Sequence, residues 1–355
     1  MTSIVQEGPL ADKRRPDMRI SAIAALCAAA AFVAFPLLLA AVAATTPAAA
    51  DPADSLFTEE SKLDSAQAGF HRLKIGKIEV TALSDGTAGF FVLNVLAESK
   101  RAEAEKLMAK SWVKQPIDAS VNAFLIKLPG HTVLVDAGTG DLFGPKLAKL
   151  PDSLRASGVK PEAITDILVT HMHPDHTGGL TIGGKVVFPN AIVHVNEREL
   201  DFWTDKVAGE NYPEPTKGFY RQVEPTVGPY LAAGRVKTFE GATELFAGLR
   251  ALPAYGHTPG HTYYVLEDGG EKLVFMGDTI HAPDAQFDDP DITIAFDVDQ
   301  VQAAATRRKA FADAARTGYF VALDHEYFPG IGRLREEGAG YRWLPIPYIN
   351  DANKR

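Results

Sequence analysis

The sequence contains very little cysteine. Cys27 is the only one in 355 residues, which excludes an internal disulfide framework and any metal site built from several thiolates. Basic runs are also short, since no stretch of consecutive Lys or Arg exceeds three residues, and 45 acidic residues outnumber 36 basic ones. The formal net charge of -9 makes the chain a poor binder of phosphate backbones, so no nucleic-acid partner is expected.

Charged residues are absent between Ile20 and Ala50. A basic cluster precedes this apolar stretch and three alanines end it, a pattern typical of a secretory signal peptide over residues 1–50. The stretch is also long enough to span a bilayer as a retained anchor, but Pro36 and Pro47 interrupt it and the alanines favour cleavage. We therefore expect an exported protein, periplasmic or secreted, that leaves by the general secretory or the twin-arginine route.

The rest of the chain is expected to form a flexible lead-in over residues 51–70 and one domain over residues 71–355, since no repeat or low-complexity linker divides it. Apolar residues over 73–83 predict a strand that ends at a turn over residues 84–87. Further strands and helices interleave along the domain, with the clearest helix over residues 301–316. This alternation predicts the α/β class.

Residues 171–176 place three histidines and one aspartate in six positions, directly after a short apolar run. Alternation along the emerging chain puts His171 and His173 on one side, and a following loop can turn Asp175 and His176 toward a second point. Imidazole and carboxylate groups suit Zn²⁺ and similar divalent ions. Ordinary surface histidines would account for one or two of these residues but not for four ligand types together, so the segment predicts a metal site.

Three further segments carry ligand-type residues near the ends of expected strands. His257 and His261 flank a Pro-Gly turn that can present His261 just before a strand, so His261 is the expected ligand and His257 the expected partner of a loop hydrogen bond. Asp278 follows an apolar run, where its two oxygens can bridge two metals, although turn aspartates are common at such places. His325 follows the last expected strand.

The order of these motifs resembles that of the metallo-β-lactamase superfamily, over about residues 70–347. The resemblance implies an αβ/βα four-layer sandwich with two divalent metal ions, Zn²⁺ or alternatively Mn²⁺ or Co²⁺, at one edge of its two sheets. Asp136 resembles the aspartate that orients ligand histidines in the family, and a simple loop cap is the alternative. The resemblance also implies the ligands: His171, His173 and His261 for one metal, Asp175, His176 and His325 for the other, and Asp278 between them with a bridging hydroxide.

Two short segments resemble one branch of the superfamily in particular, the organophosphate hydrolases; they are residues 286–290 and 328–332. This resemblance implies a homodimeric binuclear hydrolase in which a metal-bridging hydroxide cleaves organophosphate triesters such as methyl parathion. Asp175 and Asp278 would hold the ions and relay a proton. It also implies an aromatic pocket for the leaving group, made of Phe143, Trp203 and Phe219. For each of these aromatic residues a core position is the alternative.

His281 departs from the organophosphate hydrolases, which have an apolar residue three positions after the bridging aspartate. The lactonase branch has a substrate-binding tyrosine there, and a polar donor at that place would stabilise the oxyanion formed from a carbonyl, which makes His281 a candidate for substrate binding and catalysis. The alternative function is therefore an arylesterase or lactonase of the same fold, with organophosphate hydrolysis as a side activity. For His281 itself the alternative is an exposed loop residue. For the whole chain it is a metal-binding scaffold without turnover, which the complete ligand set disfavours.

Overall fold

The computed structural model describes residues 56–58, 62–214 and 216–352. The expected signal peptide over residues 1–50 lies outside the described residues. In the described part, no helix combines the length and the apolar character that crossing a membrane requires. Residues 57–58, inside the expected flexible lead-in, pair with a long strand, and the Phe57 ring stacks on Phe90 with 5.0 Å between ring centroids.

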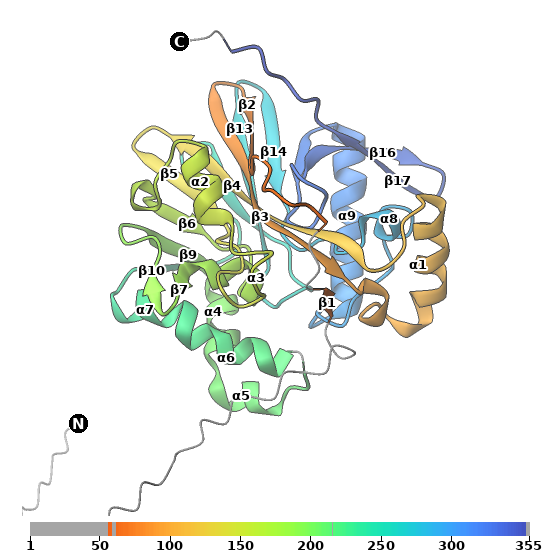
Figure 1. The fold of residues 1–355 in the computed structure, drawn as a ribbon, viewed down its shortest axis with the longest axis horizontal. Coiled ribbons are helices and arrows are strands. Elements are labelled where there is room, and N and C mark those ends of the chain that lie inside the picture. The colour runs from red at the N-terminus through yellow and green to blue at the C-terminus, as the bar shows by residue number, and fades with distance from the viewer. Residues whose placement is uncertain (1–55, 59–61, 215, 353–355) are drawn as a thin grey trace, which may run out of the picture. The chain divides into compact units, whose positions relative to one another are not determined.

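The first of two main sheets has eight strands among the described residues (Figure 1). Their order is β1-β3-β4-β5-β6-β9-β10, with β2 also paired to β3. The neighbours β3, β4 and β5 are antiparallel, whereas β5, β6, β9 and β10 run parallel to one another. The strands are β1 (Phe57–Thr58), β2 (Phe70–Ile75), β3 (Ile78–Phe90), β4 (Ile117–Leu128), β5 (His131–Val135), β6 (Asp166–Leu168), β9 (Ile192–Asn196) and β10 (Val236–Phe239).

The second sheet follows the chain order from β11 to β17. All of its pairs are antiparallel except β14 with β15, which are parallel. Its strands are β11 (Thr243–Phe246), β12 (Leu249–Pro253), β13 (Thr262–Asp268), β14 (Glu271–Phe275), β15 (Phe320–Ala322), β16 (Ile331–Glu337) and β17 (Gly340–Pro345). A small separate hairpin joins β7 (Thr181–Ile182) to β8 (Lys185–Val186).

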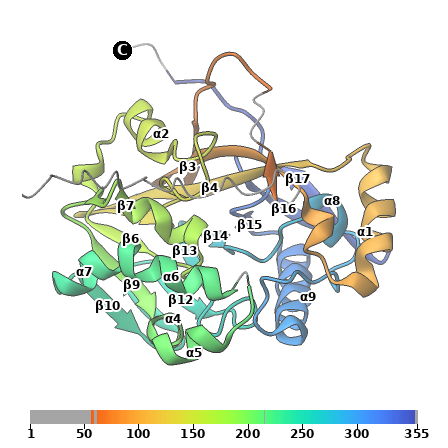
Figure 2. The same ribbon diagram turned by 60° about the horizontal axis from the view of Figure 1, so that its bottom comes forward.

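The two sheets pack on each other through a buried apolar core in which Phe124 of β4 contacts Phe275 of β14, with 5.4 Å between ring centroids. A second core covers the other face of the first sheet, beneath α2 (Leu150–Ala156), α4 (Glu197–Thr204), α6 (Thr216–Thr226) and α7 (Gly228–Ala232). A third core packs α9 (Gln300–Thr317) on the second sheet. Figure 2 shows α4, α6 and α7 together on one side and α9 on the other. The expected four-layer α/β sandwich is confirmed.

One stretch of the first sheet differs from the expectation. The strand expected over residues 73–83 is a hairpin of β2 and β3 that turns at Gly76, where φ is +57°. The turn expected over residues 84–87 is wrong, because β3 continues to Phe90 with a bulge between Ser84 and Gly86. Polar residues and a glycine with φ of +130° fit a bulge as well as they fit a turn, so the local composition misleads here.

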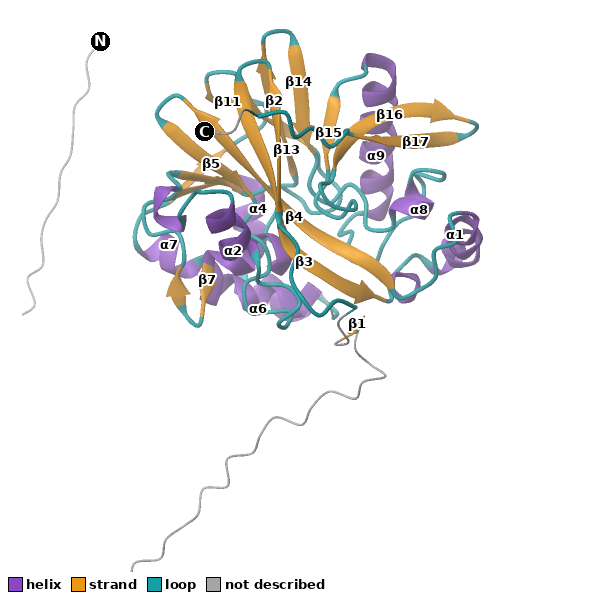
Figure 3. Cartoon of the chain, turned by 45° about the horizontal axis from the view of Figure 1, so that its top comes forward, coloured by secondary structure: helices purple, strands orange, loops and turns teal. Residues whose placement is uncertain are grey.

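The remaining helices are α1 (Glu98–Lys110), α3 (Pro174–Thr177), α5 (Lys206–Asn211) and α8 (Pro283–Gln286). The loops that carry ligand-type residues start where strands end: His171, Asp278 and His325 each come three residues after the end of β6, β14 and β15. Figure 3 shows such loops, in teal, between β4 and α9. Strand ends from both sheets therefore deliver the ligand-type side chains to one region.

Candidate metal centre

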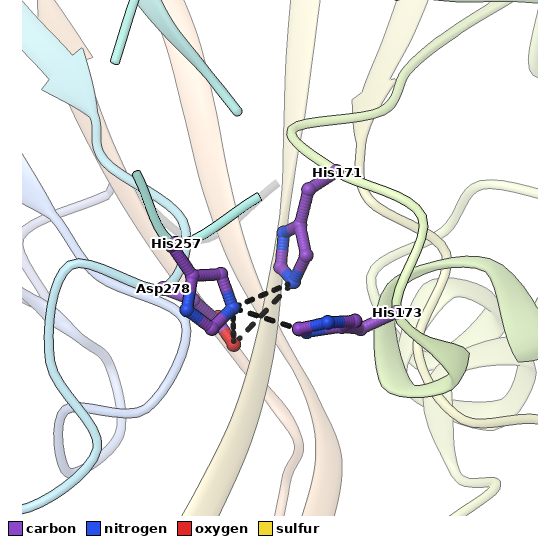
Figure 4. Close-up of side chains that lie close together, drawn as sticks. All are labelled: His171, His173, His257 and Asp278. Carbon is purple, nitrogen blue, oxygen red and sulfur yellow. Dashed lines mark hydrogen bonds and ion pairs between the residues drawn. The ribbon is translucent and has the colours of Figure 1, made fainter. Parts of the chain in front are cut away.

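Ligand-type side chains gather beyond these strand ends in three groups, and the two larger groups share one residue. The first group contains His171, His173, His257 and Asp278 and is buried (Figure 4). In each group one donor atom per residue lies within 4.8 Å of the others. The second group contains Asp175, His176, Asp278 and His325. The two groups together include every predicted ligand except His261, and they add His257.

Asp278 lies between the groups and turns one carboxylate oxygen toward each. Its Oδ1 atom is 2.9 Å from His176 Nε2 and 3.1 Å from His325 Nε2. Its Oδ2 atom is 3.3 Å from His257 Nε2 and 3.5 Å from His171 Nε2. The two oxygens of Asp278 thus face the two ligand groups separately, so this carboxylate would contact a metal ion held by either group.

The first histidine motif reaches both groups because a helix starts inside it. His173 is the N-cap residue of α3 and has extended backbone angles, and Pro174 lies in the first turn, where its fixed φ favours a helix start. The His173 ring places its Nδ1 atom 3.0 Å from His257 Nε2, in the first group. Asp175 and His176 lie inside α3 and belong to the second group.

His257, and not His261, completes the first group, which corrects the assignment from sequence. The Nδ1 atom of His257 contacts Asp297 Oδ1 at 2.8 Å, and this contact directs Nε2 toward His171 and His173. His261 belongs to neither group, and its Nδ1 atom donates to the backbone carbonyl of Ala254 at 3.1 Å. Burial, together with His257, lowers the pKa of His261 to about 3, so its imidazole is neutral.

Asp136 lies behind His176, where the sequence predicts a carboxylate that orients a ligand. Its Oδ2 atom is 2.9 Å from His176 Nδ1 and also accepts a hydrogen bond from the Thr170 hydroxyl at 2.7 Å. Its Oδ1 atom accepts from the Thr170 backbone at 2.8 Å, so the same side chain also caps the loop. Asp324, which was not among the predicted site residues, approaches His176 Nδ1 to 3.2 Å from the other sheet. A carboxylate beside the outer ring nitrogen fixes which nitrogen faces a metal.

The electrostatics of the centre fit bound cations. Burial opposes ionisation of Asp278, but His176, His325 and His171 outweigh burial and hold the pKa of this carboxyl well below its ordinary value. His176 Nε2 and Asp278 Oδ1 are buried 2.9 Å apart, and among the described residues neither atom makes a hydrogen bond. Imidazole nitrogens and carboxylate oxygens that converge in this way are ligands of Zn²⁺ and similar ions. The residues present therefore fit two divalent metal ions.

The three aromatic residues predicted to bind substrate lie in different places. Trp203 is only 1% exposed and donates from Nε1 to Glu199, with its ring 5.2 Å from that of His173, so it forms part of the wall behind this ligand. Phe219 is half-buried and lies 4.8 Å from the His173 ring. Phe143 packs against Phe57 at 5.8 Å, in a small apolar cluster beside β3 and β4. Of the three, only Phe219 offers partly exposed aromatic surface next to the metal ligands.

His281 lies inside the centre. Its Nε2 atom is 2.9 Å from Asp278 Oδ2, and its ring stacks on that of His325 with 5.2 Å between centroids. The side chain is buried, so the alternative of an exposed loop histidine is wrong. Phe296, which the sequence did not single out, lies between the rings of His281 at 6.1 Å and Phe219 at 5.8 Å. Only its position in the fold distinguishes Phe296 from other phenylalanines.

Curated relatives match part of the chain. An atrochrysone carboxyl ACP thioesterase of Passalora fulva is 28% identical over 162 residues, which cover 45% of this chain and 38% of that protein. The corresponding thioesterase of Claviceps purpurea is 26% identical over 159 residues, or 45% of this chain and 39% of that protein. The chain thus spans about two fifths of the length of the curated relatives that it matches.

Solved structures match most of the chain. The hydrolase AbOPH, described as a member of the beta lactamase superfamily, superposes with a TM-score of 0.76 at 34% identity, covering 81% of this chain and all of that one. The dizinc quorum-quenching lactonase AidC, in complex with a homoserine product, superposes with a TM-score of 0.71 at 28% identity, covering 79% of this chain and 99% of that one. The family model of the metallo-beta-lactamase superfamily matches residues 117–318. The fold, the two ligand groups and these matches together show that the chain belongs to the metallo-beta-lactamase superfamily.

Proposed function

We propose that the chain hydrolyses carbonyl esters, with lactones or aryl esters as substrates. The contact of His281 Nε2 with Asp278 Oδ2, at 2.9 Å, carries this proposal. It puts a nitrogen–hydrogen donor beside the carboxylate that the two ligand groups share. With Asp278 engaged by metal ions, this donor would be free to hydrogen-bond the oxyanion that develops when a carbonyl carbon is attacked.

Two divalent ions, proposed to be zinc with manganese or cobalt as alternatives, would supply a water of lowered pKa and Lewis acidity toward the substrate. The two ligand groups would hold them, with Asp278 in contact with both. The half-buried rings of Phe219 and Phe296 lie beside His173 and His281 and offer apolar surface to the acyl or aryl part of the substrate. No serine or cysteine nucleophile is needed in such a site.

The likeness to AidC supports a lactone substrate. That protein is described as a dizinc lactonase, and this chain is similar to it over 79% of its own length. The thioesterase relatives are similar over only 45% of the chain, so thioesters are a weaker inference. Both groups of relatives act on a carbonyl carbon, in agreement with the proposed role of His281.

Organophosphate triesters such as methyl parathion are the second candidate. Residues 286–290 and 328–332 resemble the organophosphate hydrolases of the superfamily. The Phe219 ring, 4.8 Å from His173, also places an aromatic surface where a nitrophenyl leaving group could stack. For this reaction His281 has no evident task as an acid, because a nitrophenolate leaves phosphorus without receiving a proton.

The test is kcat/KM of the metal-loaded protein on an aryl acetate, an aromatic lactone and a methyl phosphotriester, measured side by side. We expect at least about tenfold preference for a carbonyl substrate, or about 1.4 kcal/mol of transition-state binding. His281→Leu should lower kcat/KM for that substrate by about 100-fold, as loss of an oxyanion donor does, and leave the phosphotriester unaffected. His281→Asn, which keeps a donor, is the matched control. Preference for the phosphotriester would establish the second candidate instead.

We also propose that residues 1–50 direct export and are removed near Ala50, and that the mature protein is a homodimer. Mass spectrometry of the secreted or periplasmic protein should give an amino terminus close to Asp51. Sedimentation equilibrium of that material should give twice the mass of one mature chain. An intact amino terminus in the cytoplasm would contradict export, and a monomer at micromolar concentration would contradict the dimer.

A further inference from the structure

Glu199 is a fully buried carboxylate on α4, beside the metal centre. Its Oε1 atom accepts hydrogen bonds from the backbone nitrogen of Met172 at 2.8 Å and from the indole nitrogen of Trp203 at 2.6 Å. Its Oε2 atom accepts from the Thr258 hydroxyl at 2.7 Å and from the backbone nitrogen of Gly260 at 2.8 Å. Four donors thus converge on one buried charge, which compensates the loss of its hydration.

The donors come from two loops that are far apart in sequence. Met172 lies between the ligands His171 and His173, whereas Thr258 directly follows the ligand His257. These three histidines make up the nitrogen ligands of the first group. Glu199 therefore contacts both of the loops that must stay together for this group to exist. The loop from Thr258 to Gly260 carries no ligand of the second group, so the contacts of Glu199 with this loop concern the first group.

We propose that Glu199 is a positioning residue that joins these two loops and so sets the affinity of the three-histidine metal site. The proposal rests on the two-metal centre of the proposed function but not on the choice of substrate. Partners of this kind, which hold ligands without touching the metal, typically change metal affinity by about 10- to 100-fold.

The packing around Glu199 supports a fixed junction. A Cβ atom on Gly260 would lie 2.4 Å from the backbone nitrogen of Glu199 and 2.5 Å from its Cβ, so the loop lies directly against α4. Glycine is required there for this close approach, in addition to any role in the turn. On the opposite side, Trp203 is held through its Nε1 atom with its ring against His173.

An amide cannot replace this carboxylate. Burial raises the pKa of Glu199 and the four hydrogen bonds oppose that rise. All four donors are matched only by the ionised group, because glutamine offers a single acceptor oxygen and turns an NH₂ toward the other two donors. Glu199→Gln therefore keeps the shape of the side chain, but its NH₂ group faces the hydrogen-bond donors of one of the two loops and leaves them without an acceptor.

The test uses the full mature chain loaded with two Co²⁺ ions, whose visible absorption reports their ligand environment. Each variant is challenged with a chelator, and the retained cobalt and its spectrum are followed with time. We expect Glu199→Gln to lose one ion at least about tenfold faster than wild type and to keep the other. Asp201→Asn, an exposed carboxylate on the same helix, is the matched control and should behave as wild type. Thermal unfolding of the apoproteins separates this effect from a general loss of stability.

A second variant covers the case in which Glu199→Gln does not fold. Thr258→Val removes one donor, keeps the side-chain shape and leaves the carboxylate in place, and it should weaken the same ion by a smaller factor. Equal retention of both ions in Glu199→Gln and wild type would overturn the proposal, as would equal weakening of both. If wild type binds no Co²⁺, the two-metal centre fails as well, so the two failures are distinguishable.

Discussion

His257 holds its Nδ1 atom 2.8 Å from Asp297 Oδ1, and this contact turns the opposite ring nitrogen to 3.0 Å from His173 Nδ1. The relationship decides which of two histidines, four positions apart, faces the metal centre. Asp297 therefore orients the ligand His257, although the two residues are 40 positions apart in the chain.

Substitution of the two histidines should separate their roles. His257→Ala removes a ligand-type nitrogen from the first group, so the purified protein should hold one metal ion per chain where wild type holds two. His261→Ala should still hold two, because His261 lies outside both ligand groups. Elemental analysis after gel filtration gives the stoichiometry. The reverse pattern would restore the assignment made from sequence.

Asp297→Asn should weaken metal binding without removing a ligand. The loss of negative charge at His257 Nδ1 lowers the basicity of this imidazole and loosens its orientation, which should reduce affinity for one ion by about 10- to 100-fold. Competition with a chromogenic chelator measures the change. Asp291→Asn, an exposed carboxylate nearby in sequence, provides the comparison and should leave affinity unchanged. An unaltered affinity in Asp297→Asn would mean that packing alone orients His257.

Asp85→Ala should destabilise the first sheet. The bulge in β3 directs this buried carboxylate at the backbone nitrogen of Thr139 and that of Leu150, each 2.8 Å away, and at the Thr139 hydroxyl at 2.7 Å. Leaving three buried donors without a partner should cost about 3 kcal/mol or more of unfolding free energy, at about 1 to 3 kcal/mol each. Urea unfolding measures it. Asp152→Ala, at an exposed position on α2, should stay within about 0.5 kcal/mol of wild type.

Stability should fall in acid partly through His194 and Asp166, which lie 2.8 Å apart on β9 and β6. Burial lowers the pKa of His194 below its ordinary 6.5, with Asp166 opposing. Burial opposes ionisation of Asp166, but hydrogen bonds from His131 and His194 outweigh it and lower the pKa of this carboxyl. Both groups bind protons more weakly in the folded state. The contribution of His194 is therefore lost as pH falls below about 6.5, and that of Asp166 as pH falls below about 3.8.

His194→Phe tests this pH dependence. The variant removes the titrating imidazole and fills its place beside Phe246, whose ring centroid lies 5.7 Å from that of His194. Between pH 8 and pH 5.5, wild type should lose more unfolding free energy than His194→Phe, with both proteins equally loaded with metal. Parallel losses would show that acid sensitivity arises at the metal centre alone.

Local chemistry in the sequence was enough to locate most of the candidate centre. A histidine motif after an apolar run, and Asp278 and His325 after two later ones, each lie where a strand ends in the structure. Strand ends meet at sheet edges, so ligand-type residues placed there are brought together by the topology. The α/β class follows from the same alternation of apolar segments.

Other features of the site and of the first sheet could not be predicted from neighbouring residues, because they depend on partners that are distant in the sequence. The Pro-Gly turn presents His257 and His261 alike, and only the contact with Asp297 separates them. Phe296 and Glu199 carry no motif, yet one lies between Phe219 and His281 and the other between two ligand loops. The composition of residues 84–87 is compatible with a turn and with a β-bulge. The pairing of β3 with β4 on both sides of this segment shows that it is a bulge.

The sequence by itself determined the ligand types, their order and their positions after apolar runs, because metal affinity and strand formation depend on nearby residues. Tertiary structure alone decided which ring nitrogen faces the centre, that Asp297 and Asp324 stand beside ligands as Asp136 does, and that Phe296 lies among the aromatic rings. Those choices depend on hydrogen bonds and packing between segments as far apart as Asp136 and His176, or His171 and His257. Only the closed fold brings such groups within 3 to 4 Å, the range in which hydrogen bonds and van der Waals contacts act.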